Sequence, residues 1–222
     1  PTIDSGSEIK NIRLINSYLA ADYDPDNMES NGTVIAGITG YVDGTGICKI
    51  ENCIVEESVV LNDGWRQGGI AACVAGNAYI ANCSFRGVLK GKCGFAGGIV
   101  GDMWGYAQVS QCYTVGSQVV NKFDPNRGRV DRCYSDMDAY KTTHGPYHSR
   151  NILKLSVENM QGTTAAEKMN ELDFANVWHI TDKYPDIQKK PLFFNGTEGA
   201  VWSGKEAKSY ASGDGTEQNP YI

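Results

Sequence analysis

Short runs of apolar and β-branched residues, separated by glycine and polar turns, recur between residues 8 and 137. Runs of this length fit β-strands and are too short for helices. Three apolar blocks superpose, at residues 36–41, 68–73 and 97–102. Each is followed by a second block that ends in cysteine, at residues 50–53, 80–83 and 109–112, and a shortened fourth copy lies at 130–133. The pattern predicts a repeat built from strands.

The repeat returns one residue type to one position about every 30 residues. Cys53, Cys83, Cys112 and Cys133 are separated by 30, 29 and 21 residues. A sandwich of consecutive strands gives no reason for this recurrence, whereas a parallel coil stacks equivalent positions about 4.8 Å apart. The sequence therefore predicts an all-β fold, a parallel β-helix over residues 1–150. Inward columns are expected at Ile38, Ile70 and Ile99, at Ile50, Ile80, Val109 and Val130, at Cys48, Ala78 and Ala107, and at the four cysteines.

Two corners of the coil are expected to depend on backbone conformation. The first is made by Gly68-Gly69 and Gly97-Gly98, where either a positive φ or the absence of a Cβ is required. The second would stack the amides of Asn52, Asn82 and Gln111, because asparagine tolerates the left-handed region. Residues 12–17 are interpreted as a degenerate early copy, with Asn16 in the place of Asn52.

At these residues the sequence resembles the GLUG-motif repeats of bacterial cell-surface proteins, which also occur in non-catalytic regions of immunoglobulin A1 protease-like polypeptides. The clearest copy is residues 97–101 followed by Gln111-Cys112-Tyr113, and the likeness covers about residues 8–137. The resemblance implies a right-handed, single-stranded parallel β-helix located outside the cell.

The pattern changes over residues 151–194, which are expected to form a short helix-containing C-terminal cap. Residues 164–167 fit a capping box, and Ala166, Met169 and Leu172 would form one apolar face. Because open coils end in exposed edges, we expect this segment to act as a lid. Similar segments follow the repeats in GLUG proteins. Residues 195–222 are interpreted as a linker or the start of a further module.

Composition limits the classes of partner. The 222 residues carry 20 Lys and Arg against 26 Asp and Glu, a net charge of -6, which disfavours nucleic acid. No apolar stretch approaches the 18 residues of a membrane span, so we expect no membrane insertion. The seven cysteines are an odd set and are expected to be free, buried thiols. We interpret the chain as a monomeric module cut from a larger polypeptide.

Aromatic and basic residues near turns are the candidate ligand-binding groups. Aromatic rings there can stack on sugars or anchor a protein partner, although the same rings can simply shield the core. The candidates are Trp65, Arg66, Trp104 and Tyr106, with Tyr113 and Tyr134 also placed near turns. A basic patch of Arg127, Arg129 and Arg132 could meet an acidic glycan or protein.

No cofactor or metal site is expected. Asp22, Asp24 and Asp26 are a weak calcium candidate, because Asn27 replaces the turn glycine. His144 and His148 lack a helical presentation, since Pro146 lies between them, and no further ligands complete a zinc set. Residues 96–101 are similar to a dinucleotide fingerprint, but no helix follows them.

The expected function is a non-enzymatic surface module, extracellular or on the cell surface, of a secreted or wall-attached bacterial protein. It would serve as a stalk, spacer or adhesin-like region, with a host or bacterial surface protein or glycan as partner. The alternative is a carbohydrate-active β-helix enzyme, either a polysaccharide lyase or a glycoside hydrolase. Glu51, Ala81 and Ser110, beside the inward column, form no column of carboxylates for such chemistry, so any catalytic domain is expected elsewhere. Ice binding is disfavoured because no Thr-x-Thr column appears.

Overall fold

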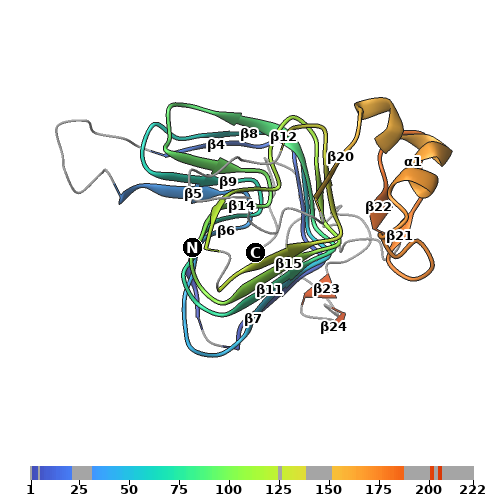
Figure 1. Ribbon diagram of the computed structural model, residues 1–222. Coiled ribbons are helices and arrows are strands. Elements are labelled where there is room, and N and C mark those ends of the chain that lie inside the picture. Colours follow the sequence, from blue (N-terminus) through green and yellow to red (C-terminus); the bar gives the residue numbers. More distant parts are fainter. Residues whose placement is uncertain are drawn as a thin grey trace, which may run out of the picture. The chain divides into compact units, whose positions relative to one another are not determined.

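The computed structural model describes residues 2–4, 6–21, 32–124, 127–138 and 152–187, and two short strands at 201–202 and 205–206. The chain divides into two compact units, residues 1–188 and 189–222. The first holds stacked parallel strands and a small helix-containing segment (Figure 1). In the second, β23 (Val201–Trp202) and β24 (Lys205–Glu206) form an antiparallel pair. The prediction of an all-β fold, a parallel β-helix followed by a small helix-containing segment, is confirmed.

Four parallel sheets, here called A to D, follow one another around each full coil. Sheet A contains β1 (Thr2–Ile3), β6 (Thr39–Val42), β10 (Ala71–Val74), β14 (Val100–Met103) and β17 (Val120–Phe123). Sheet B contains β2 (Glu8–Lys10), β7 (Cys48–Glu51), β11 (Ala78–Ala81), β15 (Ala107–Ser110) and β18 (Arg129–Asp131). Sheet C contains β3 (Arg13–Ile15), β4 (Tyr18–Ala20), β8 (Ile54–Leu61), β12 (Ser84–Lys90), β16 (Tyr113–Thr114), β19 (Cys133–Ser135) and β20 (Ile152–Lys154). Sheet D contains β5 (Val34–Ala36), β9 (Arg66–Gly68) and β13 (Phe95–Gly97).

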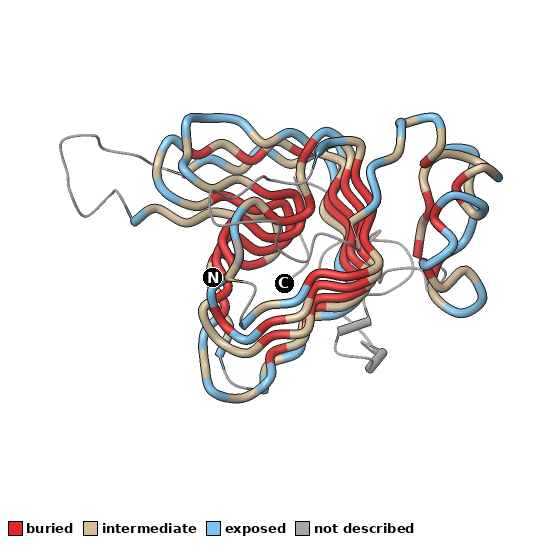
Figure 2. The backbone as a smooth tube through the Cα atoms, in the orientation of Figure 1, coloured by how far each residue is buried: buried red, intermediate tan, exposed pale blue. Residues whose placement is uncertain are grey.

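The predicted inward columns form the core. Ile80 pairs with Ile50 on one side and with Val109 on the other, and Val109 pairs with Val130. These four side chains are at most 1% exposed. Figure 2 shows buried residues returning at the same places from coil to coil. Each aliphatic side chain therefore packs against its own counterpart, as a parallel coil requires.

The cysteine column is also in register. The N–H groups of Ser84, Tyr113 and Tyr134 donate to the carbonyls of the cysteines one coil away, at 2.9, 3.1 and 3.0 Å. All seven cysteines are free, and all except the half-buried Cys93 are buried. Burial, together with the neighbouring thiols, raises the pKa of Cys83 well above its ordinary value. Because the thiols of the column are free and buried, they act as small apolar groups of the core.

The corner between sheets B and C is set by a column of left-handed residues. Their φ angles lie between 52° and 59°, and the column is Asn11, Asn52, Asn82, Gln111 and Arg132. The backbone part of the prediction is confirmed. An amide contact joins Asn52 Nδ2 to Asn11 Oδ1 at 3.1 Å, whereas the Gln111 amide donates to the Glu171 carbonyl.

The alignment of Asn16 with Asn52 is wrong. Ile9 pairs with Ile50, which places Asn11 beside Asn52. Ile15 pairs with Glu56, so Asn16 lies beside Glu57 at a second bend, where both residues have positive φ, 50° and 49°. The chain turns through the left-handed region twice in this coil, and the sequence alone does not tell the two turns apart.

The glycine corner, from sheet D to sheet A, depends on the missing Cβ. None of Gly68, Gly69, Gly97 and Gly98 has a positive φ. A Cβ on Gly69 would lie 2.1 Å from the Gly98 carbonyl oxygen, and one on Gly97 would lie 2.1 Å from that of Val100. Close approach of the backbone is therefore the reason for glycine here.

The shorter last cysteine interval reflects a shortened coil. Strand β8 has eight residues, whereas β16 has two, and the chain then returns directly to β17. The Thr114 hydroxyl donates to the Ser117 carbonyl in this turn. In this coil the sheet C strand therefore stops after two residues, and in the described part of the chain no strand of sheet D follows it before β17.

The helix-containing segment differs in detail from the expectation. Helix α1 spans Gly162–Lys168, after a 3-10 turn at Val157–Met160. Its N-cap is Gln161, which makes no side-chain cap bond, so the capping box at Thr164 is wrong. The buried face is formed by Ala165, Met169 and Leu172 instead of starting at Ala166. Tertiary packing of these residues and of buried Met160 sets the start of the helix.

This segment lies along the side of the coil, against the outer face of sheet C, and not as a lid over its end (Figure 1). Trp178 packs on Tyr113 with ring centroids 5.3 Å apart, and the Tyr113 hydroxyl donates to the Pro185 carbonyl at 2.5 Å. Arg13, on the first coil, pairs with Glu56 at 2.8 Å and with Asp186 near the antiparallel pair of β21 (Trp178–His179) and β22 (Asp186–Ile187). The segment thus joins several coils.

Candidate functional site

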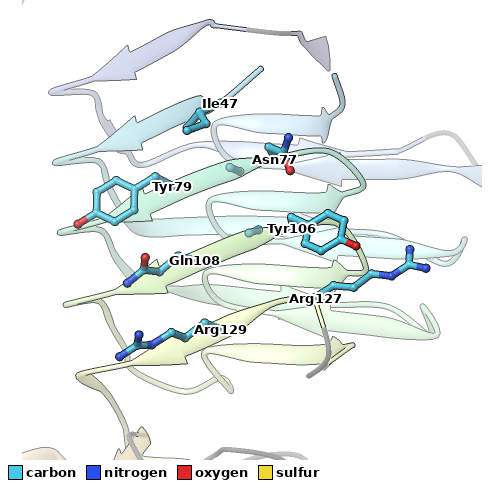
Figure 3. A pocket seen from close by; sticks show the side chains of 9 residues that line it. Ile47, Asn77, Tyr79, Tyr106, Gln108, Arg127 and Arg129 are labelled. Carbon is cyan, nitrogen blue, oxygen red and sulfur yellow. The ribbon is translucent and has the colours of Figure 1, made fainter. Parts of the chain in front are cut away.

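A shallow trough of about 470 Å³ lies on the outer face of sheet B, beside the corner with sheet A (Figure 3). We call it the sheet B trough. Its lining residues come from successive coils: Ile47, Asn77, Ala78, Tyr79, Tyr106, Ala107, Gln108, Arg127 and Arg129.

Strand alternation builds the floor and one side of the trough. Ala78 and Ala107 pair directly across β11 and β15, and their methyl groups point toward the core. The next residue of each strand therefore faces outward. These residues form the strand ridge: Tyr79, Gln108 and Arg129, in register on β11, β15 and β18.

The opposite side is formed at the corner between sheets A and B. The corner ridge consists of Ile47, Asn77, Tyr106 and Arg127. Glycines beside this ridge let the coils approach closely, since a Cβ on Gly105 would lie 2.2 Å from the Gly76 carbonyl oxygen. The side chains of the two ridges lean away from one another, which leaves the trough open (Figure 3).

Basic residues of the last described coil border one end of the trough. Arg129 Nη2 lies 3.0 Å from the buried Asp131 carboxylate, and Arg132 Nε lies 3.5 Å from the same group. Arg127 Nε lies 3.6 Å from Asp124. Arg127 and Arg129 line the trough, and with Arg132, which does not line it, the predicted basic patch has three guanidinium groups against two carboxylates.

Each tyrosine of the trough has a distinct environment. The Tyr106 ring is 65% exposed, with the Arg127 guanidinium 5.9 Å from its centroid. Burial is the main cause that raises the pKa of Tyr79, and the nearby Glu51 carboxylate raises it further. The Tyr79 hydroxyl therefore keeps its proton at neutral pH and can donate a hydrogen bond.

Of the four predicted ligand-binding residues, Tyr106 lies apart from the other three, of which Arg66 and Trp104 both lie near Cys73 and Trp65 stacks on Arg66. Tyr106 lines the trough, whereas Arg66 lies on sheet D and pairs with the buried Asp102 of sheet A at 2.7 Å. Trp65 stacks on Arg66 at 3.6 Å. Trp104 is 43% exposed and contacts the Cys73 thiol. Burial raises the pKa of this thiol. Whether these residues bind anything stays a prediction.

Two further aromatic residues near turns take the alternative role, that of rings that shield the core. Tyr113 and Tyr134 are fully buried beneath the helix-containing segment. The Tyr134 hydroxyl accepts the Glu171 N–H at 3.0 Å. Burial also raises the pKa of Tyr113 to about 12. Their outward direction on sheet C suits a packed segment rather than a ligand.

Sequence reasoning missed Tyr79, Gln108 and Asn77. It took Ala81 and Ser110 as the outward positions of sheet B, but both are buried, and the Ser110 hydroxyl accepts a bond from Arg132 at 3.0 Å. By strand alternation the residues on both sides of the inward column face outward, but the trough is lined by the column that precedes it. Extending the repeat alignment by one residue toward the N-terminus would have found it.

The weak metal candidates Asp22, Asp24, Asp26, His144 and His148 lie outside the described residues. Within the ranges that the structure describes, no group of three or more His, Cys, Asp or Glu side chains is placed to hold a metal ion. No helix in those ranges has the length and apolar character to cross a membrane.

Comparison with known proteins identifies no relative: no family model, no curated protein and no solved structure matches the chain.

Proposed function

We propose that this chain is a non-enzymatic module of a secreted or wall-attached bacterial surface protein, acting as a stiff stalk or spacer with an adhesive face. The observation that carries the proposal is the in-register stack that presents the sheet B trough. Each coil is hydrogen-bonded to its neighbours through several sheets, as the parallel pairing of β10 with both β6 and β14 illustrates. Such a stack resists bending because any bend must break bonds between coils.

The chemistry of the trough supports binding over catalysis. Its described lining offers phenol, amide, guanidinium and methyl groups and no carboxylate. Glycoside hydrolysis generally needs two carboxyl groups at a fixed separation. Glu56 and Asp186 share Arg13 as a partner, but both are engaged in ion pairs at the inner edge of the helix-containing segment. They serve as contacts that hold this segment.

The resemblance to GLUG repeats, noted above for residues 8–137, supports the surface location. Burial of the cysteine column is compatible with that location, because thiols with no exposed surface are shielded from an oxidising environment.

The test combines binding and turnover on one preparation. The full chain is incubated with a panel of neutral and acidic polysaccharides, and both retention on the immobilised polysaccharide and release of reducing ends or unsaturated sugars are measured. Retention without product is the expected result. Product formation that scales with protein concentration would refute the non-enzymatic function.

A second measurement addresses the spacer. The chain is inserted between a wall anchor and a terminal tag on a bacterial surface, and the height of the tag above the wall is measured by fluorescence. A flexible linker of equal residue number is the control. The coil should hold the tag at a narrow distribution of heights, and a distribution as broad as that of the linker would contradict stiffness.

A further inference from the structure

We propose that the sheet B trough binds a linear acidic glycan that carries a carboxylate on several of its sugars. The inference rests on the proposed binding function and names the class of ligand for it. The glycan would span both ridges, meeting Tyr106 and Arg127 on the corner ridge and Gln108 and Arg129 on the strand ridge.

Charge favours an anionic ligand. The side chains of Arg127 and Arg129 are 50% and 67% exposed, respectively. Each contacts its carboxylate partner through a single nitrogen, Nε in Arg127 and Nη2 in Arg129. A guanidinium has five N–H donors, so both retain donors for a bound carboxylate.

The positions of the two guanidinium groups indicate more than one carboxylate. Arg127 and Arg129 stand on opposite ridges and point away from one another (Figure 3). A single carboxylate therefore does not meet both arginines. The carboxylates of two sugars of one glycan chain can each meet one arginine. Linking the two contacts makes the second one intramolecular, so affinity should rise steeply with chain length.

Tyrosine and amide groups favour sugar between these charges. Tyr106 and Gln108 lie on one coil, and Asn77 and Tyr79 lie on the next, about 4.8 Å away along the axis. Each coil thus offers one ring for stacking and one amide for hydroxyl groups, and their order across the trough is reversed between the coils. Because the methyl groups of Ala78 and Ala107 point toward the core, no side chain rises from the floor, which leaves room for a chain between the ridges.

A peptide is a poorer fit. Strands β11 and β15 are paired on both sides, so their backbone offers no free edge for an added strand. The trough is open and shallow, and its floor consists of alanine, so it provides no deep apolar pocket for an anchor side chain. Recognition through ridge side chains suits hydroxyl and carboxylate groups instead.

The experiment measures binding of oligogalacturonate to the full chain by calorimetry. Three comparison probes are galacturonate monomer, the same oligomer after reduction of its carboxyl groups, and a polyglutamate of equal charge. We expect the oligomer to bind at least about tenfold more tightly than each of the other probes, a factor that corresponds to a single well-formed contact. Binding should weaken as salt is raised, because the contacts are exposed charges.

Variants locate the site. Arg127→Gln with Arg129→Gln should weaken oligomer binding about tenfold or more, and Tyr106→Ala should weaken it several-fold. The matched control is Lys90→Gln with Lys92→Gln, which removes the same charge from exposed residues at the far end of β12 and should change affinity less than about twofold. Circular dichroism confirms that each variant folds.

The outcomes separate the two proposals. Equal weakening by the arginine and the lysine pairs, or no oligomer binding, overturns the acidic-glycan site. If the oligomer with reduced carboxyl groups binds tightly, and Tyr106→Ala weakens that binding, the ligand is not an acidic glycan. That result overturns the inference and leaves the adhesive function intact. Polyglutamate binding equal to that of the oligomer assigns the trough to acidic peptides and overturns the inference. Cleavage of the oligomer overturns the non-enzymatic function and leaves the acidic specificity standing.

Discussion

Replacing Gly69 with alanine tests the contact between coils at the glycine corner. The new Cβ would lie 2.1 Å from the Gly98 carbonyl oxygen and 2.2 Å from Cδ2 of Phe85. The Gly98 oxygen accepts the N–H of Ile70 at 3.1 Å, one of the bonds that join adjacent coils. Since the clash is with backbone, one coil must shift, and this hydrogen bond weakens.

The expected cost follows from three contributions. Overpacking a dense core costs about 1–3 kcal/mol, and a weakened hydrogen bond adds about 0.5–1.5 kcal/mol. The reduced freedom of the unfolded chain offsets about 0.4–1 kcal/mol. The φ of Gly69 is not positive, so alanine adds no backbone strain of that kind. Together these contributions span about 0.5–4 kcal/mol, so Gly69→Ala should destabilise the protein by about 2 kcal/mol, the middle of that range.

The assay is urea unfolding followed by far-ultraviolet circular dichroism. With a slope of about 1–3 kcal/mol per molar urea, the midpoint should fall by about 1 M or more. Gly94→Ala is the matched control, because Gly94 is exposed and its new Cβ would find its nearest neighbour at 3.7 Å, an ordinary contact. That variant should match or slightly exceed the natural stability. Equal midpoints for the two variants would refute the argument from close approach.

Three further predictions concern the helix-containing segment and the thiols. Arg13→Met removes the partner of Asp186 and one of the two partners of Glu56, so proteolysis within residues 152–187 should become several-fold faster. The exposed Lys168→Met should not change the rate, and equal rates for the two variants would contradict a role of Arg13 in docking. Because burial raises the pKa of Tyr113 to about 12 while the unfolded value is about 10, the folded state disfavours the phenolate. About 2–3 kcal/mol of stability should thus be present below pH 10 and be lost as the pH rises toward 12, and Tyr113→Phe should lack this loss when unfolding free energies are compared across that range. A thiol reagent should label at most the half-buried Cys93 in the native protein and all seven cysteines in denaturant; rapid native labelling of Cys83 would contradict the buried column.

The repeat made the coil predictable. Inward columns such as Ile50, Ile80 and Val109 are visible in the sequence because, in a parallel stack, each coil packs against a near copy of itself. The same holds for the left-handed corner, since the demand for asparagine at Asn52 returns at Asn82. Local spacing therefore carries long-range information in this fold.

Features without a repeat required the tertiary structure. Arg13 and Asp186 are 173 residues apart in sequence, and no periodicity connects them. The start of α1 follows from burial of Ala165 and Met169 against sheet C, which overrides the local cap at Thr164.

The trough shows the same division between sequence and structure. The order of residues is enough to place Tyr106 near a turn and Arg127 close to Arg129 along the chain. Tyr79 and Gln108 share one surface with these residues because of the way the coils stack. A side chain's neighbours on a coil come from the coils above and below, so the register between coils, and not the order of residues within one, determines what a ligand meets.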